Sequence, residues 1–232
     1  MVLVEIAEKD TRSCLVYRKL NKLTKTQFFP LPNIEQRVET VAAAKYISVL
    51  DLTKGYWQIP LTPNAQTLAT FVTSFEIFRH LRMPFGLKNT PFIFSKMMAE
   101  ILHGCEHFAI PYLDDVEIYS NSWEEHLNHL NGILTNIKDV GLTIKPTKCK
   151  FAQDRVKYLG HIVGHGIRTP NEMKVKAVLE FPVPTTKSQV RAFLGLEDYY
   201  NHYIPMFSYI VTPFTETLKG KLRKRKINWT EE

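Results

Sequence analysis

The sequence predicts an α+β fold, in which helices pack on one face of an antiparallel sheet. Short runs rich in β-branched and aromatic residues occur in neighbouring pairs, as they do in hairpins. Amphipathic stretches separate these pairs, and the pattern becomes wholly helical after Asn171. Single strands do not alternate with single helices, so a parallel βαβ sheet is disfavoured. At 232 residues the chain is long enough to bury a substantial core.

Strands are expected throughout the first two thirds of the chain. A short strand followed by a basic loop is predicted around 14–22. The runs 46–52 and 56–61 flank the break TKG, which predicts a hairpin with Asp51 near its turn. Further strands are predicted at 68–73, 76–83, 108–115, 116–120, 142–145, 156–160 and 161–164.

Capping residues indicate where the helices begin. Asn33 is the expected N-cap of one helix, and Asn89 or Thr90 caps another that ends at Gly104. Capping boxes are predicted for Ser122 with Glu125 and for Thr186 with Gln189. The predicted buried faces comprise Ile34, Val38, Val41 and Ala42, and in the 122–141 helix Leu127, Leu130, Ile133, Leu134 and Ile137. Further helices are predicted at 171–181, 186–196 and up to Leu218, separated by prolines.

The positive charge of the chain is concentrated in one segment. The net charge is +7, and residues 219–226 (KGKLRKRK) contribute six of those charges, so the remainder sums to 7 − 6 = +1. This segment fits either a solvated linker or a nucleic-acid contact. No apolar run is long enough for a transmembrane helix, and no signal peptide is visible. Three cysteines without a C-x-x-C pair predict reduced thiols and an intracellular protein with no membrane partner.

Three aspartates define the candidate catalytic chemistry. Asp51 ends one predicted strand, and Asp114 and Asp115 join two others. If those strands are neighbours, the three carboxylates meet at one sheet edge, where they repel one another and raise a pKa unless a cation intervenes. Mg²⁺ prefers oxygen ligands of this kind, and two ions clamp the attacking and leaving oxygens of a phosphoryl transfer. Asp is also common in hairpin turns, so the residues alone leave a turn-forming role equally open.

Several motifs surround these aspartates in a fixed order. They are LDLTKGYWQIPL, LRMPFGLKNTPFIF, YLDD, KYLGHIV and VPTTKSQVRAFLGL. Together they resemble the reverse transcriptase domain of long-terminal-repeat retroelements, most closely gypsy-like elements and their retroviral relatives. The resemblance runs from about Val4 to Glu232. One Y-x-D-D motif would be weak evidence, whereas several blocks in the same order are specific.

The resemblance implies a right-hand polymerase with an antiparallel palm sheet, partial fingers and a small helical thumb. Fingers and palm would occupy residues 1–170, with the fingers truncated at the N-terminus, and the thumb 171–218. A basic linker, 219–232, would lead to an RNase H-like domain that is absent. The implied reaction adds deoxynucleotides from their triphosphates to a primer on an RNA or DNA template. Asp51, Asp114 and Asp115 match the family's catalytic carboxylates, which hold two Mg²⁺ ions, or Mn²⁺ as a substitute.

The resemblance also assigns binding roles to individual residues. Those matching nucleotide-binding positions are Lys9, Arg12, Lys54, Gly55, Tyr56, Phe85 and Gly86. Tyr56 matches the family's steric gate against a ribose 2′-hydroxyl, although a core tyrosine would fit the same pattern. Those matching primer or template contacts are Asn89, Pro91, Tyr112, Leu113, Lys148, Leu159, Gly160 and His161. Helix capping explains Asn89 and Pro91 equally well.

The chain departs from the family pattern at several positions. KDTR shortens the expected fingertip turn, and Val16 stands where an aspartate is usual. Glu117 occupies an apolar position on the strand of Asp115, and Glu197 and Asp198 replace small residues. We expect these changes to alter charge where side chains pack, which is costly for a lone buried carboxylate.

These departures support an alternative hypothesis, a catalytically weak or inactive retroelement remnant that keeps the fold. The intact aspartates favour the enzyme instead. A nucleotide cyclase with the same palm would need a Gly-Gly-acid-aromatic turn, which YLDD does not provide. The nearby histidine pairs are expected on solvated surfaces rather than at metal sites; they are His126 with His129 and His103 with His107. The oligomeric state is not predicted.

Overall fold

The computed structural model describes residues 2–6, 9–30, 33–112, 114–219, 227 and 229. The chain divides into two compact units, which we describe separately. The first comprises 1–156 and 164–166, and the second comprises 157–163 and 167–232. The strands after residue 156 therefore group mainly with the C-terminal helices, while the division at residue 170 stays a prediction.

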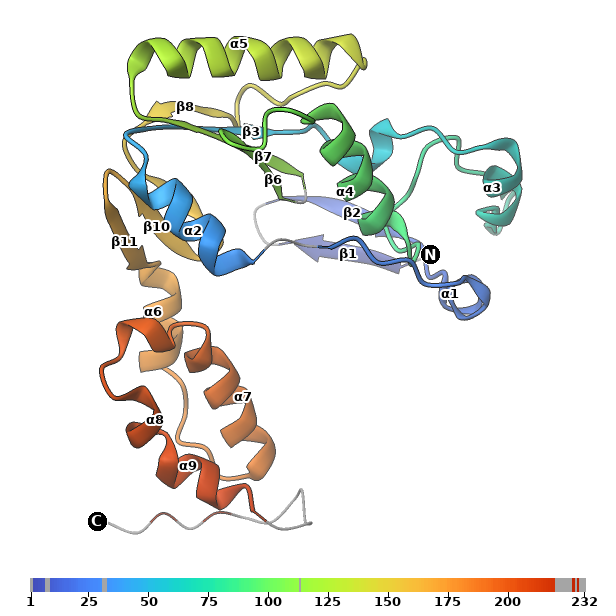
Figure 1. The fold of residues 1–232 in the computed structure, drawn as a ribbon. Coiled ribbons are helices and arrows are strands. Elements are labelled where there is room, and N and C mark those ends of the chain that lie inside the picture. Colours follow the sequence, from blue (N-terminus) through green and yellow to red (C-terminus); the bar gives the residue numbers. More distant parts are fainter. Residues whose placement is uncertain are drawn as a thin grey trace. The chain divides into compact units, whose positions relative to one another are not determined.

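A four-stranded sheet forms the centre of the first unit (Figure 1). Its strands are β3 (Tyr46–Asp51), β6 (Ala109–Tyr112), β7 (Asp115–Ser120) and β8 (Lys150–Gln153). They lie in the order β6-β7-β3-β8, and β3 pairs antiparallel with both of its neighbours. Because helices lie between the strands in the chain and the pairing is antiparallel, the predicted α+β class is confirmed.

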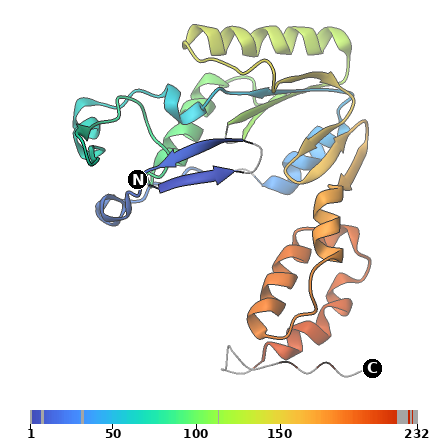
Figure 2. The same ribbon diagram turned by 180° about the vertical axis from the view of Figure 1, so that it is seen from behind.

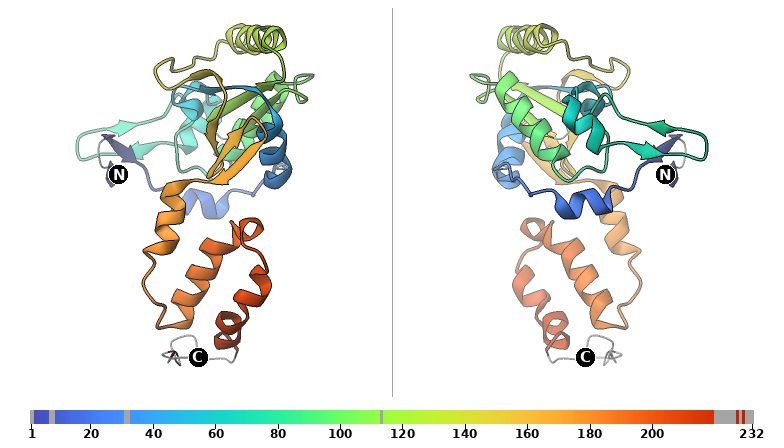
Figure 3. Two further views of the ribbon diagram at one scale, coloured as in Figure 1. Left: turned by 90° about the vertical axis from the view of Figure 1, so that its left-hand side faces the viewer. Right: turned by 90° about the vertical axis from the view of Figure 1, so that its right-hand side faces the viewer.

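Helices cover both faces of this sheet rather than the single face that we expected. Helices α4 (Thr90–Ile101) and α5 (Trp123–Asp139) lie on one side, and α2 (Ile34–Ala43) lies on the other (Figures 1 and 3). The core on the α4 and α5 side includes Leu50, Val116, Ile118, Phe94, Met98, Ile133 and Ile137. Since β7 is buried on both faces, an alternation of apolar and polar residues could not reveal the second helical layer.

The predicted helix starts are confirmed more closely than the predicted faces. Asn33 caps α2, and both capping boxes form, at the start of α5 and of α7 (Lys187–Asp198). Asn89 occupies the N-cap position of α4, but its side chain makes no capping bond there. Two residues placed on buried faces are exposed, Ile34 and Leu127. The core of α5 instead includes His126, so the expected solvated position of that histidine was wrong.

Two segments near the sheet differ from the prediction. The expected strand at 56–61 begins as a 3₁₀ turn, η1 (Gly55–Gln58), and β3 pairs with β7 and β8 rather than with it. The turn begins at Lys54, whose φ of 49° is left-handed. The predicted basic loop contains a short helix, α1 (Arg18–Leu23). Periodicity cannot distinguish such short helical turns from strands.

Small elements complete the first unit. A hairpin joins β1 (Val2–Ile6) to β2 (Lys9–Cys14), and a second joins β4 (Phe71–Val72) to β5 (Ile77–Phe78). The sequence did not indicate α3 (Pro63–Leu68), which covers part of the predicted strand 68–73, or β8. The segment 142–145, expected as a strand, makes only an isolated bridge between Leu52 and Ile144.

The second unit combines a small sheet with short helices (Figure 2). Its strands, in the order β11-β10-β9, are β9 (Val156–Tyr158), β10 (His161–Gly164) and β11 (Ile167–Pro170). With α7, its helices are α6 (Glu172–Leu179), η2 (Asn201–Tyr203), α8 (Phe207–Ile210) and α9 (Thr212–Thr217). Strand β11 was not predicted. Within the described residues, no helix has the length and apolar character needed to cross a membrane.

Candidate active site

The ends of β3 and β7 bring the three predicted carboxylates to one edge of the sheet. Asp51 lies directly opposite Asp115 in the antiparallel register, and Asp114 immediately precedes β7. The N–H of Leu52 donates to the carbonyl of Asp114 at 2.8 Å, and the N–H of Lys145 donates to that of Asp51 at 2.8 Å. Backbone hydrogen bonds therefore hold the aspartate-bearing ends of both strands in register.

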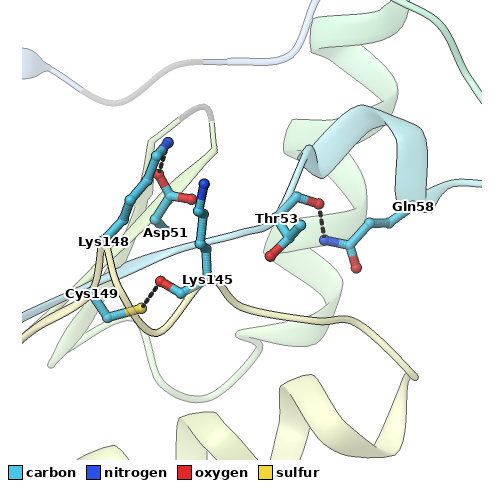
Figure 4. Close-up of polar contacts among 6 residues, drawn as sticks. All are labelled: Asp51, Thr53, Gln58, Lys145, Lys148 and Cys149. Carbon is cyan, nitrogen blue, oxygen red and sulfur yellow. Dashed lines mark hydrogen bonds and ion pairs between the residues drawn. The ribbon is translucent and has the colours of Figure 1, made fainter. Parts of the chain in front are cut away.

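The carboxylates make this edge electrostatically strained. Burial raises the pKa of Asp115, and the charges of Asp51 and Asp114 raise that pKa further. Lys148 acts in the opposite direction, and its Nζ lies 2.9 Å from Oδ2 of Asp51 (Figure 4). Lys148, which the sequence assigned to primer or template contacts, therefore forms an ion pair with a catalytic candidate. Within the described part of the chain, this ion pair offsets part of the negative charge at the edge.

The carboxylates are the ligand type that a divalent cation prefers, but they are not arranged as a complete metal site. Among the described residues, no three His, Cys, Asp or Glu side chains are grouped so that they could hold a metal ion. Mg²⁺, however, is commonly held by one or two carboxylates, with water and phosphate oxygens completing its shell. Asp51 and Asp115, as cross-strand partners, provide such a pair. A cation there would also offset the repulsion that raises the pKa of Asp115.

The 3₁₀ turn η1 packs tightly against this edge. A Cβ atom on Gly55 would lie 2.8 Å from Oδ1 of Asp114 and 2.9 Å from the ring of Phe94. Tyr56 is buried, with its ring centroid 5.0 Å from that of Phe85 and 5.2 Å from that of Phe94. Burial raises the pKa of Tyr56, and the charge of Asp114 adds to this shift. Gly55 is thus required for the close approach, and Tyr56 is held in place by edge-to-face packing.

Gln58 fixes η1 to the loop after α5, a role that the sequence did not indicate. Its Nε2 donates to the carbonyls of Thr53 at 2.7 Å and Thr143 at 2.9 Å. Its Oε1 accepts from the N–H of Thr143 at 2.7 Å (the contact with Thr53 is drawn in Figure 4). A glutamine beside two aromatic residues gives no local signal for this contact, because its partner lies 85 positions away.

The loop with Phe85 and Gly86 is fixed by contacts with α1. Gly86 has a left-handed φ of 96°, and a Cβ there would lie 3.1 Å from the carbonyl oxygen of Leu15. Asn21 donates to the carbonyl of Gly86 at 2.8 Å. The Asn89 amide donates to the carbonyl of Lys25 at 2.9 Å, so in this structure Asn89 links the loop after α1 to α4.

The remaining predicted contacts of the first unit are distributed along its elements. Tyr112 lies opposite Asp115 in β6, Pro91 opens α4, and Lys54 is exposed at the start of η1. Lys9 and Arg12 lie on β2, and only their backbone is described. Leu113 lies outside the described residues.

The predicted primer contacts 159–161 lie in the second unit. Leu159 and Gly160 both have positive φ values, 45° and 79°. His161 is buried and packs among the rings of Tyr199, Tyr200 and Tyr203.

Glu117 is the departure from the family pattern that most affects the site. It is 3% exposed and lies on β7 opposite Val49 and Ile110, and its Oε2 has no hydrogen-bond partner among the described residues. Burial raises its pKa well above the usual range, and Asp115 adds to this effect, while Arg37 opposes it. Glu117 is therefore a costly buried acid next to the candidate site.

The other departures affect packing less than we expected. Val16 and Asp198 are exposed, so neither changes charge inside the core. Glu197 is half-buried, and burial raises its pKa. The residues KDTR form part of β2.

His126 belongs to a buried polar network rather than to a solvated face. Its Nε2 lies 2.7 Å from Oγ of Ser48, and its Nδ1 lies 3.0 Å from Oγ of Ser120. His129 lies 2.8 Å from the same Ser120 hydroxyl. Burial lowers the pKa of His126. The network connects β3 and β7 to α5 within the unit that carries the aspartates.

A family model and curated relatives match this chain over most of its length. The model of the family described as "Reverse transcriptase (RNA-dependent DNA polymerase)" matches residues 7–163. The chain is 36% identical over 223 residues to the "Retrovirus-related Pol polyprotein from transposon 297" of Drosophila melanogaster, covering 95% of this chain and 21% of that protein. It is 33% identical to the polyprotein from transposon gypsy of the same organism, covering 91% of this chain and 21% of that one. The chain thus spans about a fifth of these relatives.

Solved structures share the fold. A foamy viral protease-reverse transcriptase in complex with double-stranded DNA superposes with a TM-score of 0.89 at 22% identity, covering 99% of this chain and 40% of that one. The same viral protein in complex with an RNA/DNA hybrid gives a TM-score of 0.79 at 22% identity, covering 97% of this chain and 31% of that one.

Proposed function

Because the chain belongs to the reverse transcriptase family, we propose that it is an RNA-directed DNA polymerase domain that extends a primer with deoxynucleotides. The observation that carries this proposal is the pairing of Asp51 with Asp115 at a strand end, with Asp114 adjacent. Burial, and after it the like charges of Asp51 and Asp114, raise the pKa of Asp115, and a bound cation would offset that repulsion.

We assign Asp51, Asp114 and Asp115 as the residues that hold Mg²⁺, with Mn²⁺ as a substitute. When bound, two such ions supply charge neutralisation and orientation for the phosphoryl transfer. The protein supplies rigidity, since backbone hydrogen bonds hold both aspartate-bearing strand ends. Lys148 balances part of the charge at Asp51, and Gly55 allows η1 to approach Asp114 closely.

The nucleotide is proposed to lie beside η1 and the loop of Phe85. Tyr56 is buried and makes edge-to-face contacts with Phe85 and Phe94, which suits a steric gate against a 2′-hydroxyl. Lys9, Arg12 and Lys54 are proposed to neutralise the triphosphate, and the first N–H groups of η1 lack acceptors within that turn. Gly86 allows the loop its left-handed turn and its close packing against the carbonyl of Leu15, which fixes the backbone beside the proposed nucleotide.

A duplex formed by the template and the primer is the proposed nucleic-acid partner. The solved relatives in complex with double-stranded DNA and with an RNA/DNA hybrid support this choice, because they share the fold over nearly the whole chain. The proposed contacts are Asn89, Pro91, Tyr112, Leu113, Lys148, Leu159, Gly160 and His161.

One observation favours the second candidate function, an inactive remnant that keeps the fold. The carboxyl of Glu117 is buried two positions from Asp115 in the sequence. Its Oε2 atom has no hydrogen-bond partner among the residues that the structure describes. If this acid disturbs the aspartates, the domain binds nucleic acid without extending it.

Primer extension distinguishes the two functions. We expect the 232-residue chain to incorporate deoxynucleotides with Mg²⁺, and Asp114→Asn to reduce the rate at least about 100-fold, because charge stabilisation at the reacting phosphate is removed. Asp139→Asn, at an exposed position in α5, is the matched control and should leave the rate unchanged. If the natural chain incorporates no more than Asp114→Asn does, the remnant hypothesis replaces the enzyme.

A further inference from the structure

The turn between β9 and β10 has an unfavourable backbone conformation. Leu159 and Gly160 occupy consecutive left-handed positions, with φ of 45° and 79°. Two such residues form the tight type of hairpin turn that normally favours Asn or Gly at both positions. A leucine in this conformation costs about 1–2 kcal/mol, so the turn needs support from outside the hairpin.

Two tyrosines supply that support through their hydroxyl groups. The Tyr199 hydroxyl donates to the carbonyl of Leu159 at 2.5 Å, and the Tyr200 hydroxyl donates to that of Gly160 at 3.0 Å. A Cβ on Gly160 would lie 2.8 Å from the Tyr200 hydroxyl oxygen, so the glycine is needed for this approach. Both tyrosines lie just after α7, 40 positions away from their partners in the chain.

A third tyrosine fixes the residue after the turn. Nδ1 of His161 lies 2.9 Å from the Tyr203 hydroxyl, which also accepts from Nε of Arg168 at 2.9 Å. The His161 ring stacks on Tyr199, with centroids 5.3 Å apart, and meets Tyr200 edge-on at 5.4 Å. The turn and the residue after it are therefore held by a cluster from one short segment, 199–203.

We propose that Tyr199 and Tyr200 are positioning residues for primer binding, acting through the carbonyls of Leu159 and Gly160. The inference rests on the proposed function, because it takes the 159–161 turn as the primer contact. The two hydroxyls hold the turn in its left-handed conformation and thereby set where the backbone of the turn meets the primer.

The Tyr200 hydroxyl is suited to this task across the working pH range. Burial raises the pKa of Tyr200, and its neighbours Tyr199 and Tyr203 add to that shift, so its hydroxyl remains a donor. Tyr200 is buried, whereas Tyr199 is 43% exposed. We therefore expect the Tyr200 bond to be the stronger of the two, since water competes less with a buried hydroxyl; the Gly160 carbonyl also accepts from the N–H of Asn171 at 3.0 Å.

The test uses the double variant Tyr199→Phe/Tyr200→Phe, which removes both hydroxyls and keeps both rings. Removing two neutral hydrogen bonds should raise the KM for the primer–template duplex about tenfold. The kcat at saturating duplex and the KM for the deoxynucleotide should stay unchanged, because the aspartates are untouched. Tyr209→Phe is the matched control, since Tyr209 is 76% exposed on α8 and its hydroxyl has no hydrogen bond among the described residues.

Direct measurements separate this inference from the proposed function. Amide hydrogen exchange of peptides covering 158–161 should become faster in the double variant and not in Tyr209→Phe. Duplex binding by the natural chain tests the proposed function, and its absence would remove both proposals. If the natural chain binds the duplex but the double variant has an unchanged KM for it, only the positioning role is overturned. A decrease in kcat as large as the increase in KM would have the same meaning. If the double variant does not fold, Tyr200→Phe alone should raise the KM for the duplex by a smaller factor and leave kcat unchanged.

Discussion

Glu117 adds a buried acidic group next to the candidate catalytic aspartates. Its carboxyl is almost completely buried on β7, where Val49 and Ile110 are its neighbours on the adjacent strands. Arg37 reduces the cost of its charge, but that guanidinium also donates to the carbonyl of Pro111 at 2.8 Å. Because burial dominates, the folded state favours the protonated acid.

The first prediction concerns the pH dependence of stability. The pKa of Glu117 in the folded state lies above its ordinary value of 4.5. The contribution of the protonated acid to the free energy of unfolding is therefore fully present below about pH 4.5, and it disappears as the pH rises through the folded-state pKa. Glu117→Gln mimics the protonated acid and should stabilise the chain by about 1–3 kcal/mol at pH 8, with little gain at pH 4.5. Urea unfolding at both pH values measures this difference. The exposed Glu39→Gln is the control, and an equal effect of both variants at pH 8 would contradict the prediction.

Lys148 provides the second prediction at this scale, because its ammonium occupies an oxygen that a metal ion would use. Its Nζ lies 2.9 Å from Oδ2 of Asp51, and the two side chains are 52% and 19% exposed. Replacing Lys148 by Met frees that oxygen and increases the negative charge at the edge. We therefore expect Mn²⁺, measured by the decrease of its free electron paramagnetic resonance signal, to bind severalfold more tightly.

The control for this measurement lies on the same turn. Lys145 donates its backbone N–H to the Asp51 carbonyl, and within the described residues its ammonium forms no ion pair (Figure 4). Lys145→Met removes a nearby charge without freeing a carboxylate oxygen, so its effect on Mn²⁺ should be smaller. Equal changes in the two variants would show that general charge, rather than the ion pair, governs the affinity.

Among the elements, η1 is the one whose packing most directly fixes an aspartate. It is anchored by Gln58 at one end and by the Tyr56 ring in the middle. Gly55 leaves space for Oδ1 of Asp114, which would lie 2.8 Å from any added Cβ. The turn therefore couples its own backbone position to that of a catalytic candidate.

Gly55→Ala should reduce primer extension much more than it reduces stability. The added methyl must displace either Asp114 or Phe94, and a shift of about 1 Å in a reacting group costs about 100-fold in rate. Gly132→Ala in α5 is the matched control, since a Cβ there meets nothing within 4 Å and alanine favours the helix by about 1 kcal/mol. Extension rates with thermal melting of both variants make the comparison. Unchanged extension by Gly55→Ala would mean that η1 does not position Asp114.

The elements also show which features the sequence could predict. Caps and long amphipathic helices depend on neighbouring residues, so the capping boxes of α5 and α7 were predictable. The positions of Asp51 and Asp115 at strand ends were predictable because each lies at the end of a strand-like run, whereas the pairing of β3 with β7 entered the prediction only as a condition. The partners of His126 and Gln58 were not, because Ser48 and Thr143 are distant in the sequence. A histidine on an amphipathic helix is typical of a solvated face, and only tertiary structure buries it.

At the scale of the whole molecule, charge is distributed unevenly between residues 219–226 and the rest of the chain. Residues 219–226 contribute six of the seven net positive charges, leaving +1 elsewhere. A nearly neutral body gives little long-range attraction for a polyanion. If the domain binds a nucleic-acid duplex, much of the salt-dependent part of the affinity should therefore come from this segment.

The last prediction tests that division of charge. The natural chain should bind a primer–template duplex with an affinity that falls log-linearly with salt, because phosphate contacts release counterions. Replacing the basic residues of the segment by Gln should reduce the magnitude of that slope by up to about 0.9 for each phosphate that is no longer neutralised; they are Lys219, Lys221, Arg223, Lys224, Arg225 and Lys226. Fluorescence anisotropy across a salt series measures both slopes.

The control replaces a cation that already has a partner. Lys96 on α4 pairs with Glu100 at 3.8 Å, so Lys96→Gln should leave the slope unchanged. A slope that is steep in the natural chain and equally steep without the basic side chains of 219–226 would place the phosphate contacts elsewhere in the chain. Local clusters of cations, rather than net charge, would then attract the duplex. A flat response in the natural chain would argue against a nucleic-acid partner, because neutralised phosphates necessarily make the affinity depend on salt.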